Sequence, residues 1–310
     1  MNTLAPIKQT KLYGLDPYFD ELKRLYNNQC YPNKILFSGQ KGIGKSTLAF
    51  HFINFVLSLD EDYKYILNDL SINSESSVYK TIVNKSNTNL VVVDVNIDKK
   101  SIDINQIRNL IINLNKSSFN DKPRFVLIDN IEFLNVNSNN ALLKILEEPN
   151  QNINFILIHN NKKVLPTLLS RCINFKMNIS NKESINISNK LLNDDLDNLV
   201  CNELLNYYFT PGEIYYLVKF SLENEYDLSK LNVKSFLKIL IKDGHYKKSN
   251  FISNIMYNYI EFYFRKLNIA SSEFINRKYI YFVKKIADTK TYNLDKETLF
   301  IEFDEEILDG

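Results

Sequence analysis

The sequence predicts an α/β domain, a parallel sheet with helices on both faces, followed by two helical domains. Through residue 179, short apolar runs alternate with segments of helical periodicity. The runs at 90–93 and 125–128 are apolar throughout, as in strands that are buried on both faces. After residue 180 the chain has three glycines and one proline, and residues 251–266 place apolar side chains on one helical stripe. We therefore predict domains at 1–179, 180–220 and 221–310.

The elements of the first domain follow in order from these patterns. Residues 1–30 predict a short lead and an amphipathic helix. The polar stretch 60–88 predicts a further helix and a loop. Strands are predicted at 34–37, 90–94, 124–129, 154–159 and 173–177, and helices at 45–59, 104–114, 138–147 and 165–170.

Composition excludes several classes of protein. The chain is 45% hydrophobic and 24% charged, as soluble globular proteins are. Its apolar runs are too short to cross a bilayer, and its N-terminus has no basic and apolar leader, so we expect neither a membrane segment nor secretion. Cys30, Cys172 and Cys201 lack Cys-x-x-Cys spacing, which favours a reducing, cytoplasmic setting and argues against a zinc module. The net charge of +2 predicts that any DNA contact is local or shared with partners.

A glycine-rich run between the first predicted strand and helix indicates a phosphate site. Glycines let backbone N–H groups turn inward, and a helix N-terminus adds positive charge. We expect Lys45 to reach the β- and γ-phosphates of ATP and the Ser46 hydroxyl to hold Mg²⁺. A strand-to-helix turn would explain the glycines but not Lys and Ser at these offsets. The run reads Gly39-Gln40-Lys41-Gly42-Ile43-Gly44-Lys45-Ser46-Thr47, which fits Gly-x-x-x-x-Gly-Lys-Ser.

Asp129 directly follows the apolar run 125–128 and is a second candidate for the same site. A carboxylate at the end of a buried strand is the form of a Walker B aspartate, which helps to hold Mg²⁺. Taken alone, Asp129 is explained equally well as a residue that caps a strand. The phosphate run upstream favours the metal-binding interpretation.

Three motifs in the right order resemble the AAA+ clamp-loader subunits of bacterial DNA polymerase III. They are the glycine run, residues 140–149 (Asn-Ala-Leu-Leu-Lys-Ile-Leu-Glu-Glu-Pro) and Ser170-Arg171-Cys172. Within this family the chain is most similar to the delta-prime branch, through residues 42–49, 104–110 and 293–296. The match is dense over 12–177 and thin but colinear beyond. The resemblance implies an AAA+ domain, a small helical lid domain and a helical C-terminal collar domain through which the subunits assemble.

The resemblance also implies a role for Arg171 and a set of partners. In clamp loaders the arginine of the Ser-Arg-Cys motif reaches the γ-phosphate that a neighbouring subunit binds, where it stabilises the charge of phosphoryl transfer. Without the resemblance, Arg171 would be interpreted as one half of a surface ion pair. The implied partners are motor subunits of the tau/gamma type and the delta subunit, and through the complex the sliding clamp and primer-template DNA.

The chain departs from the family pattern at several positions. Motor subunits place Glu directly after the Walker B aspartate to activate water. Here Asn130 stands there, so the catalytic base is missing unless Glu132 substitutes. Glu213 stands where an arginine usually touches the nucleotide, and His159 and Asn160 occupy the sensor 1 position. Residues 60–90 contain no cysteine, so we expect no four-cysteine zinc module.

These features favour a delta-prime-like clamp-loader subunit, which helps ATP-dependent loading of the sliding clamp with weak or no turnover of its own. Two alternatives stay open. A catalytically active tau/gamma-like ATPase is favoured by Lys45, Ser46 and Asp129 and opposed by Asn130 and Glu213. A small-molecule kinase would use the same phosphate run, but the long helical tail fits an assembly domain better than a lid.

Overall fold

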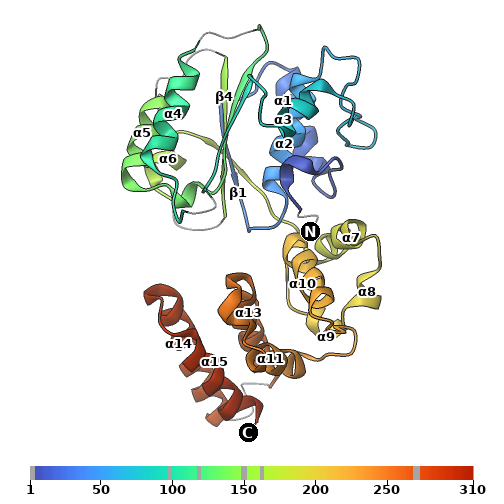
Figure 1. The fold of residues 1–310 in the computed structure, drawn as a ribbon, viewed down its shortest axis with the longest axis vertical. Coiled ribbons are helices and arrows are strands. Elements are labelled where there is room, and N and C mark those ends of the chain that lie inside the picture. The colour runs from blue at the N-terminus through green and yellow to red at the C-terminus, as the bar shows by residue number, and fades with distance from the viewer. Residues whose placement is uncertain are drawn as a thin grey trace. The chain divides into compact units, whose positions relative to one another are not determined.

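The protein is described from a computed structural model, in which residues 4–96, 99–116, 120–147, 152–160, 164–267 and 273–309 are described. The chain forms two compact units. The first extends to Leu191 and also includes Thr210–Ile214, and the second consists of Leu192–Phe209 and the chain from Tyr215 onward. Figure 1 shows the predicted α/β part and the predicted helical part. The division of the helical part into domains at 180–220 and 221–310 stays a prediction.

The first unit is built on five parallel strands, whose ends differ from the predicted ones by at most one residue. Because the carboxyl ends of parallel strands meet at one edge, the ends of β1, β3 and β4 lie together. At that edge Ser38 of β1 is paired with His159 of β4. The strand order is β2 (Leu90–Val93), β3 (Arg124–Ile128), β4 (Ile153–His159), β1 (Lys34–Ser38) and β5 (Ile173–Lys176).

Helices cover both faces of this sheet, as predicted (Figure 1). One face carries α1 (Asp16–Asn27), α2 (Lys45–Leu57) and α3 (Ser77–Val83), and the other carries α4 (Ile104–Leu114), α5 (Val136–Glu147) and α6 (Pro166–Leu169). Compared with prediction, α5 begins two residues earlier and α2 ends two residues earlier. The unit is completed by α7 (Asn181–Leu192) and two short 3-10 helices, η1 (Pro6–Lys8) and η2 (Ile131–Phe133).

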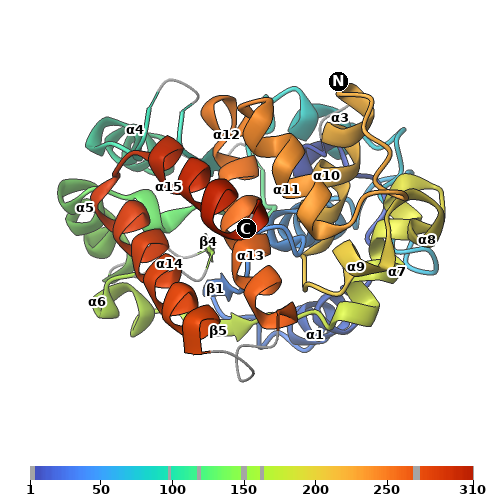
Figure 2. The same ribbon diagram turned by 90° about the horizontal axis from the view of Figure 1, so that it is seen from below.

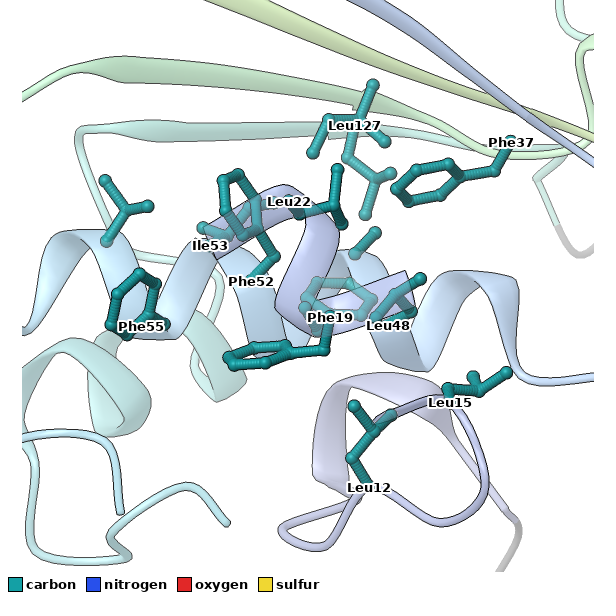
Figure 3. Close-up of a cluster of buried hydrophobic side chains, with 14 of the residues drawn as sticks. Leu12, Leu15, Phe19, Leu22, Phe37, Leu48, Phe52, Ile53, Phe55 and Leu127 are labelled. Atoms are coloured by element: carbon teal, nitrogen blue, oxygen red, sulfur yellow. The ribbon is translucent and has the colours of Figure 1, made fainter. Parts of the chain in front are cut away.

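A buried apolar cluster holds α2 in place against the sheet (Figure 3). Phe52 of α2 and Phe19 of α1 are fully buried in it, together with Phe37 and Leu127 of the sheet. Burying one such side chain contributes about 1.5–3 kcal/mol. Because α2 is buried along nearly its whole length, its first turn is held rigidly at the end of β1. The glycine run connects β1 to α2, so it is held at both of its ends.

The helices after residue 192 pack around aromatic side chains. Phe264 of α13, Phe282 of α14 and Phe303 of α15 are fully buried, with ring centroids 5.3–5.9 Å apart. Figure 2 shows these three helices side by side. Within the described residues, no helix is long and apolar enough to span a membrane. The helices are α8 (Leu196–Leu199), α9 (Asn202–Leu205), α10 (Pro211–Glu223), α11 (Val233–Lys242), α12 (His245–Lys248), α13 (Asn250–Lys266), α14 (Glu273–Tyr292), α15 (Lys296–Phe303) and the π-helical turn η4 (Asp304–Leu308).

Candidate functional site

The glycine run forms a loop between β1 and α2, at the carboxyl edge of the sheet. Gly42 and Gly44 have φ values of 91° and 95°, in the left-handed region where a side chain would be strained. Gly44 is the N-cap of α2, so the first N–H groups of this helix face the loop. Ile43 is buried and anchors the loop to the core, while Thr47 is partly buried in the first turn. This is the backbone arrangement that binds phosphate.

Lys45 lies inside this loop and is 3% exposed. Its Nζ donates to the carbonyl oxygens of Gly39 at 2.9 Å and Gln40 at 2.5 Å. Burial lowers the pKa of Lys45 to about 8, against the opposing effects of Asp129 and Glu132. The ammonium group thus lies where the loop would surround a phosphate, and a bound anion would favour its charged form.

Ser46 and Asp129 are in direct contact, although they are far apart in the sequence. The Ser46 hydroxyl, in the first turn of α2, donates to Asp129 Oδ2. Asp129 directly follows β3, and burial raises the pKa of its carboxyl group. A hydroxyl and a carboxylate oxygen next to a phosphate loop are ligands suited to Mg²⁺. The structure therefore brings together the two residues that the sequence predicted as magnesium ligands.

Asn130, next to Asp129, is fully engaged by its own chain. Its backbone is left-handed, with a φ of 57°, and its N–H donates to Asp129 Oδ1 at 2.8 Å. Its side-chain Nδ2 donates to Asp94 Oδ1 at 2.8 Å. Its Oδ1 accepts from Asn160 Nδ2 at 2.8 Å. An amide held in this way offers no basic oxygen to a water molecule.

Glu132 joins this amide network through Asn160. Its Oε1 accepts a 3.0 Å hydrogen bond from Asn160 Nδ2, the group that also binds Asn130. Its Oε2 is buried and has no hydrogen-bond partner among the described residues, and the same is true of His159 Nδ1. The Glu132 charge raises the pKa of Lys45, so the two lie within electrostatic reach. These unpartnered atoms fit a site that completes its hydrogen bonds with a ligand.

Glu213 has a local structural role that sequence reasoning missed. Its Oε2 accepts from the Thr210 N–H at 2.9 Å and from the Thr210 hydroxyl at 3.0 Å, and its own N–H donates to Thr210 Oγ1 at 3.4 Å. This is a capping box at the start of α10, and the Thr-x-x-Glu spacing could have predicted it. Burial raises the pKa of the Glu213 carboxyl group. Glu213 thus caps a helix, and its charge also lies within electrostatic reach of Lys41 in the phosphate loop.

Arg171 lies two residues after the end of α6, in the middle of the Ser-Arg-Cys triplet. Its Nη1 donates to the carbonyl of Thr167 at 2.8 Å, and its Nη2 forms an ion pair with Glu147 at the end of α5. Its side chain is 31% exposed. Glu148 and Pro149, which complete the motif at 140–149, lie outside the described residues. The trans role of Arg171 stays a prediction.

Comparison with known proteins relates the chain to one family. A family profile described as DNA polymerase III, delta subunit, matches residues 15–181, which is more than half of the chain. DNA polymerase III subunit gamma of Buchnera aphidicola subsp. Schizaphis graminum is 32% identical over 152 residues, covering 48% of this chain and 39% of that protein. DNA polymerase III subunit delta' of the same organism is 28% identical over 194 residues, covering 60% and 55%. A putative replication factor C small subunit of Acanthamoeba polyphaga mimivirus is 27% identical over 289 residues, covering 86% and 75%.

The matches to gamma and gamma/tau relatives span less than half of those proteins, 27–39% of their length. Among solved structures, a DNA polymerase III, gamma subunit-related protein from Thermotoga maritima gives a TM-score of 0.50 at 18% identity, covering 91% of this chain and 96% of that one. At this identity the likeness shows the fold, and the predicted AAA+ P-loop fold class is confirmed. On the match over residues 15–181, the chain belongs to the DNA polymerase III, delta subunit family.

Proposed function

We propose that this chain is a delta-prime-like subunit of the DNA polymerase III clamp loader, which binds ATP with Mg²⁺ and turns it over weakly or not at all. One observation carries the proposal. Lys45 lies inside the glycine loop, the Ser46 hydroxyl donates to Asp129, and Asn130 directly follows that aspartate. Binding groups are therefore present, while the position that activates water in related motors holds an engaged amide.

The proposal includes partners and a substrate for the whole assembly. The curated relatives are named as gamma, tau and delta' subunits of DNA polymerase III, which supports a place in one complex with subunits of those types. In that complex the chain would help to load the sliding clamp onto primed DNA. Arg171 would act on the ATP of a neighbouring subunit.

Two measurements on the purified full-length chain test the proposal. Binding of a fluorescent ATP analogue with Mg²⁺ should be saturable, and Lys45→Ala should weaken it because the charge inside the loop is lost. Steady-state hydrolysis by the same preparation should be slow, far below the rate of a motor subunit. If the chain alone hydrolysed ATP rapidly, and Lys45→Ala abolished this, the proposal would be wrong.

A tau/gamma-like ATPase is the second candidate, and one observation favours it. Glu132 offers a buried carboxylate oxygen without a partner among the described residues, close to Lys45. A motor of this kind would hydrolyse ATP continuously. Its hydrolysis rate would rise when the other subunits, the clamp and DNA were added. The hydrolysis measurement above separates the two candidates.

A further inference from the structure

We propose that Glu132 is the proton acceptor of this ATP site. It would activate the attacking water, which the amide of Asn130 cannot do. The inference rests on the proposed function, because it requires ATP to bind at the loop. It identifies the side chain that would take the proton during the weak ATP hydrolysis of this chain. It does not make the chain a motor, because Glu132 stands three residues after Asp129 and not directly after it, where motor subunits place their base.

The backbone after β3 brings Glu132 back toward the loop. Asn130 is left-handed, and η2 (Ile131–Phe133) follows at once, so the chain turns sharply at the end of the strand. Ile131 is 2% exposed and fixes this turn in the core. Glu132 is therefore held on a short, anchored turn beside Asp129, and not on a free loop.

Asn160 orients the Glu132 carboxylate. Its Nδ2 group donates to Glu132 Oε1 at 3.0 Å and to Asn130 Oδ1 at 2.8 Å. One carboxylate oxygen is thus occupied, while Oε2 is buried and has no partner among the described residues. A buried, charged oxygen without a partner is costly, so it is expected where a ligand or a water molecule supplies the missing hydrogen bond.

In this cluster of described carboxylates, Glu132 is the one with a buried oxygen that has no hydrogen-bond partner. Asp129 accepts from Ser46 and from the Asn130 N–H, as a magnesium ligand would be held. Asp94 is exposed and accepts from Asn130 and from the Val95 N–H. The Glu132 charge acts on Lys45, whose ammonium group lies in the phosphate loop.

Hydrolysis at this site would be a single displacement at the γ-phosphorus, with Glu132 as the proton acceptor. A water molecule between Glu132 and the γ-phosphate gives one proton to Oε2 while its oxygen forms a bond to the γ-phosphorus. The bond from that phosphorus to the bridging oxygen breaks, and ADP leaves with the electron pair. The proton then passes from Glu132 to solvent. Lys45 stabilises the charge that develops on the phosphate oxygens.

Glu132→Gln in the full-length chain tests the inference, with Glu21→Gln on the exposed face of α1 as the matched control. Hydrolysis is measured in a single turnover with protein in excess, and affinity is measured with a non-hydrolysable ATP analogue. Loss of a general base lowers a rate by about a hundredfold or more, so Glu132→Gln should lose nearly all turnover. Its affinity for the analogue should be equal or tighter, because a negative charge near the phosphates is removed.

A further measurement needs no nucleotide. The pKa of Lys45, about 8 and supported by the Glu132 charge, should fall in Glu132→Gln and stay the same in Glu21→Gln. The pH dependence of acylation at Lys45, followed by mass spectrometry, reports it. This measurement reports only that the Glu132 charge lies near Lys45, and the single-turnover rate reports its role as proton acceptor.

Three outcomes would overturn the inference. One is hydrolysis by Glu132→Gln at the rate of the unchanged chain. Another is a loss of turnover in His159→Gln but not in Glu132→Gln, which would transfer the role to the imidazole. The third is that the unchanged chain binds the analogue but hydrolyses ATP no faster than the uncatalysed reaction. This third outcome would not contradict the proposed function. Failure of the unchanged chain to bind the analogue would instead contradict the proposed function.

Discussion

The N–H of Gly212 donates a 3.0 Å hydrogen bond to the carbonyl of Gly42, so α10 begins against the phosphate loop. Each glycine leaves room for the other segment. A Cβ on Gly42 would lie 2.4 Å from Thr210 Oγ1, and a Cβ on Gly212 would lie 3.0 Å from backbone atoms of Gly42. The loop is therefore held on one side by α2 and on the other by residues 210–214.

Gly212→Ala is expected to weaken ATP binding without unfolding the chain. The added methyl group would press on the backbone of Gly42, whose φ of 91° leaves it few alternatives. Alanine is also a better helix former than glycine, by up to about 1 kcal/mol, and this opposes a loss of stability. We expect a fall in affinity of about tenfold with the melting temperature nearly unchanged. Equal affinity would show that this contact does not shape the loop.

The affinity for ATP should depend on pH through Lys45. Burial lowers its pKa from 10.5 to about 8, so the ammonium form is lost from the nucleotide-free chain above that pH. Because phosphate binds the charged form, affinity should fall by up to about tenfold per pH unit between 8 and 9.5. Titration with a fluorescent analogue measures this. Lys45→Arg stays charged over the range, and its profile should be flat even if its affinity is lower.

The same shift has a consequence for stability, with the opposite sign. Between pH 8 and 10.5 the unfolded chain binds more protons at position 45 than the folded chain does. The free energy of unfolding contributed by this residue therefore rises with pH across that window. Below pH 8 both states are protonated and the cost of burying the charge is constant. Lys45→Met should remove this part of the pH dependence.

The sequence predicted the sheet, the loop and the Ser46–Asp129 pair because those features depend on local patterns. Apolar strands, a glycine run and a strand-end carboxylate can each be recognised within a few residues. The link from Asn160 to Glu132 could not be predicted in this way. It depends on the left-handed turn at Asn130 and on β4 lying beside β3, and both are set by tertiary packing. The helix cap made by Glu213 could have been predicted from the Thr-x-x-Glu spacing, and its place relative to a nucleotide stays a prediction.

Exposed apolar side chains on α14 are expected to contribute to assembly with a motor subunit. Phe274 and Ile280 are 62% and 61% exposed in a helix whose other side packs on α13 and α15. Ile280→Glu should weaken binding to a tau/gamma-type subunit by about tenfold or more, because a buried apolar anchor would become a charge. The affinity of the pair, measured by calorimetry, reports this. Asn198→Glu, at an exposed position on α8, is the control, because positions on α14 four residues from Ile280 share its face.

Arg171 is held by its own chain in a way that a neighbouring subunit could release. Its guanidinium group pairs with Glu147, whose side chain is 52% exposed, and it donates to the carbonyl of Thr167. An exposed ion pair of this kind contributes about 1 kcal/mol or less. A γ-phosphate across an interface offers more charge and fits the planar donors of arginine. The contact with Glu147 is therefore no obstacle to a role in trans.

Arg171→Ala should leave the fold, ATP binding by this chain and assembly of the complex nearly unchanged. It should lower the DNA- and clamp-stimulated ATPase of the reconstituted complex, because a trans arginine is worth on the order of 10³-fold at a site that depends on it. The loss in the total rate would be smaller, since the other sites keep their own arginines. Glu147→Gln is the matched control: it breaks the same ion pair but leaves the guanidinium free, so its complex should keep the full rate. A complex with Arg171→Ala that hydrolyses ATP and loads clamps at the unchanged rate would rule out the role in trans.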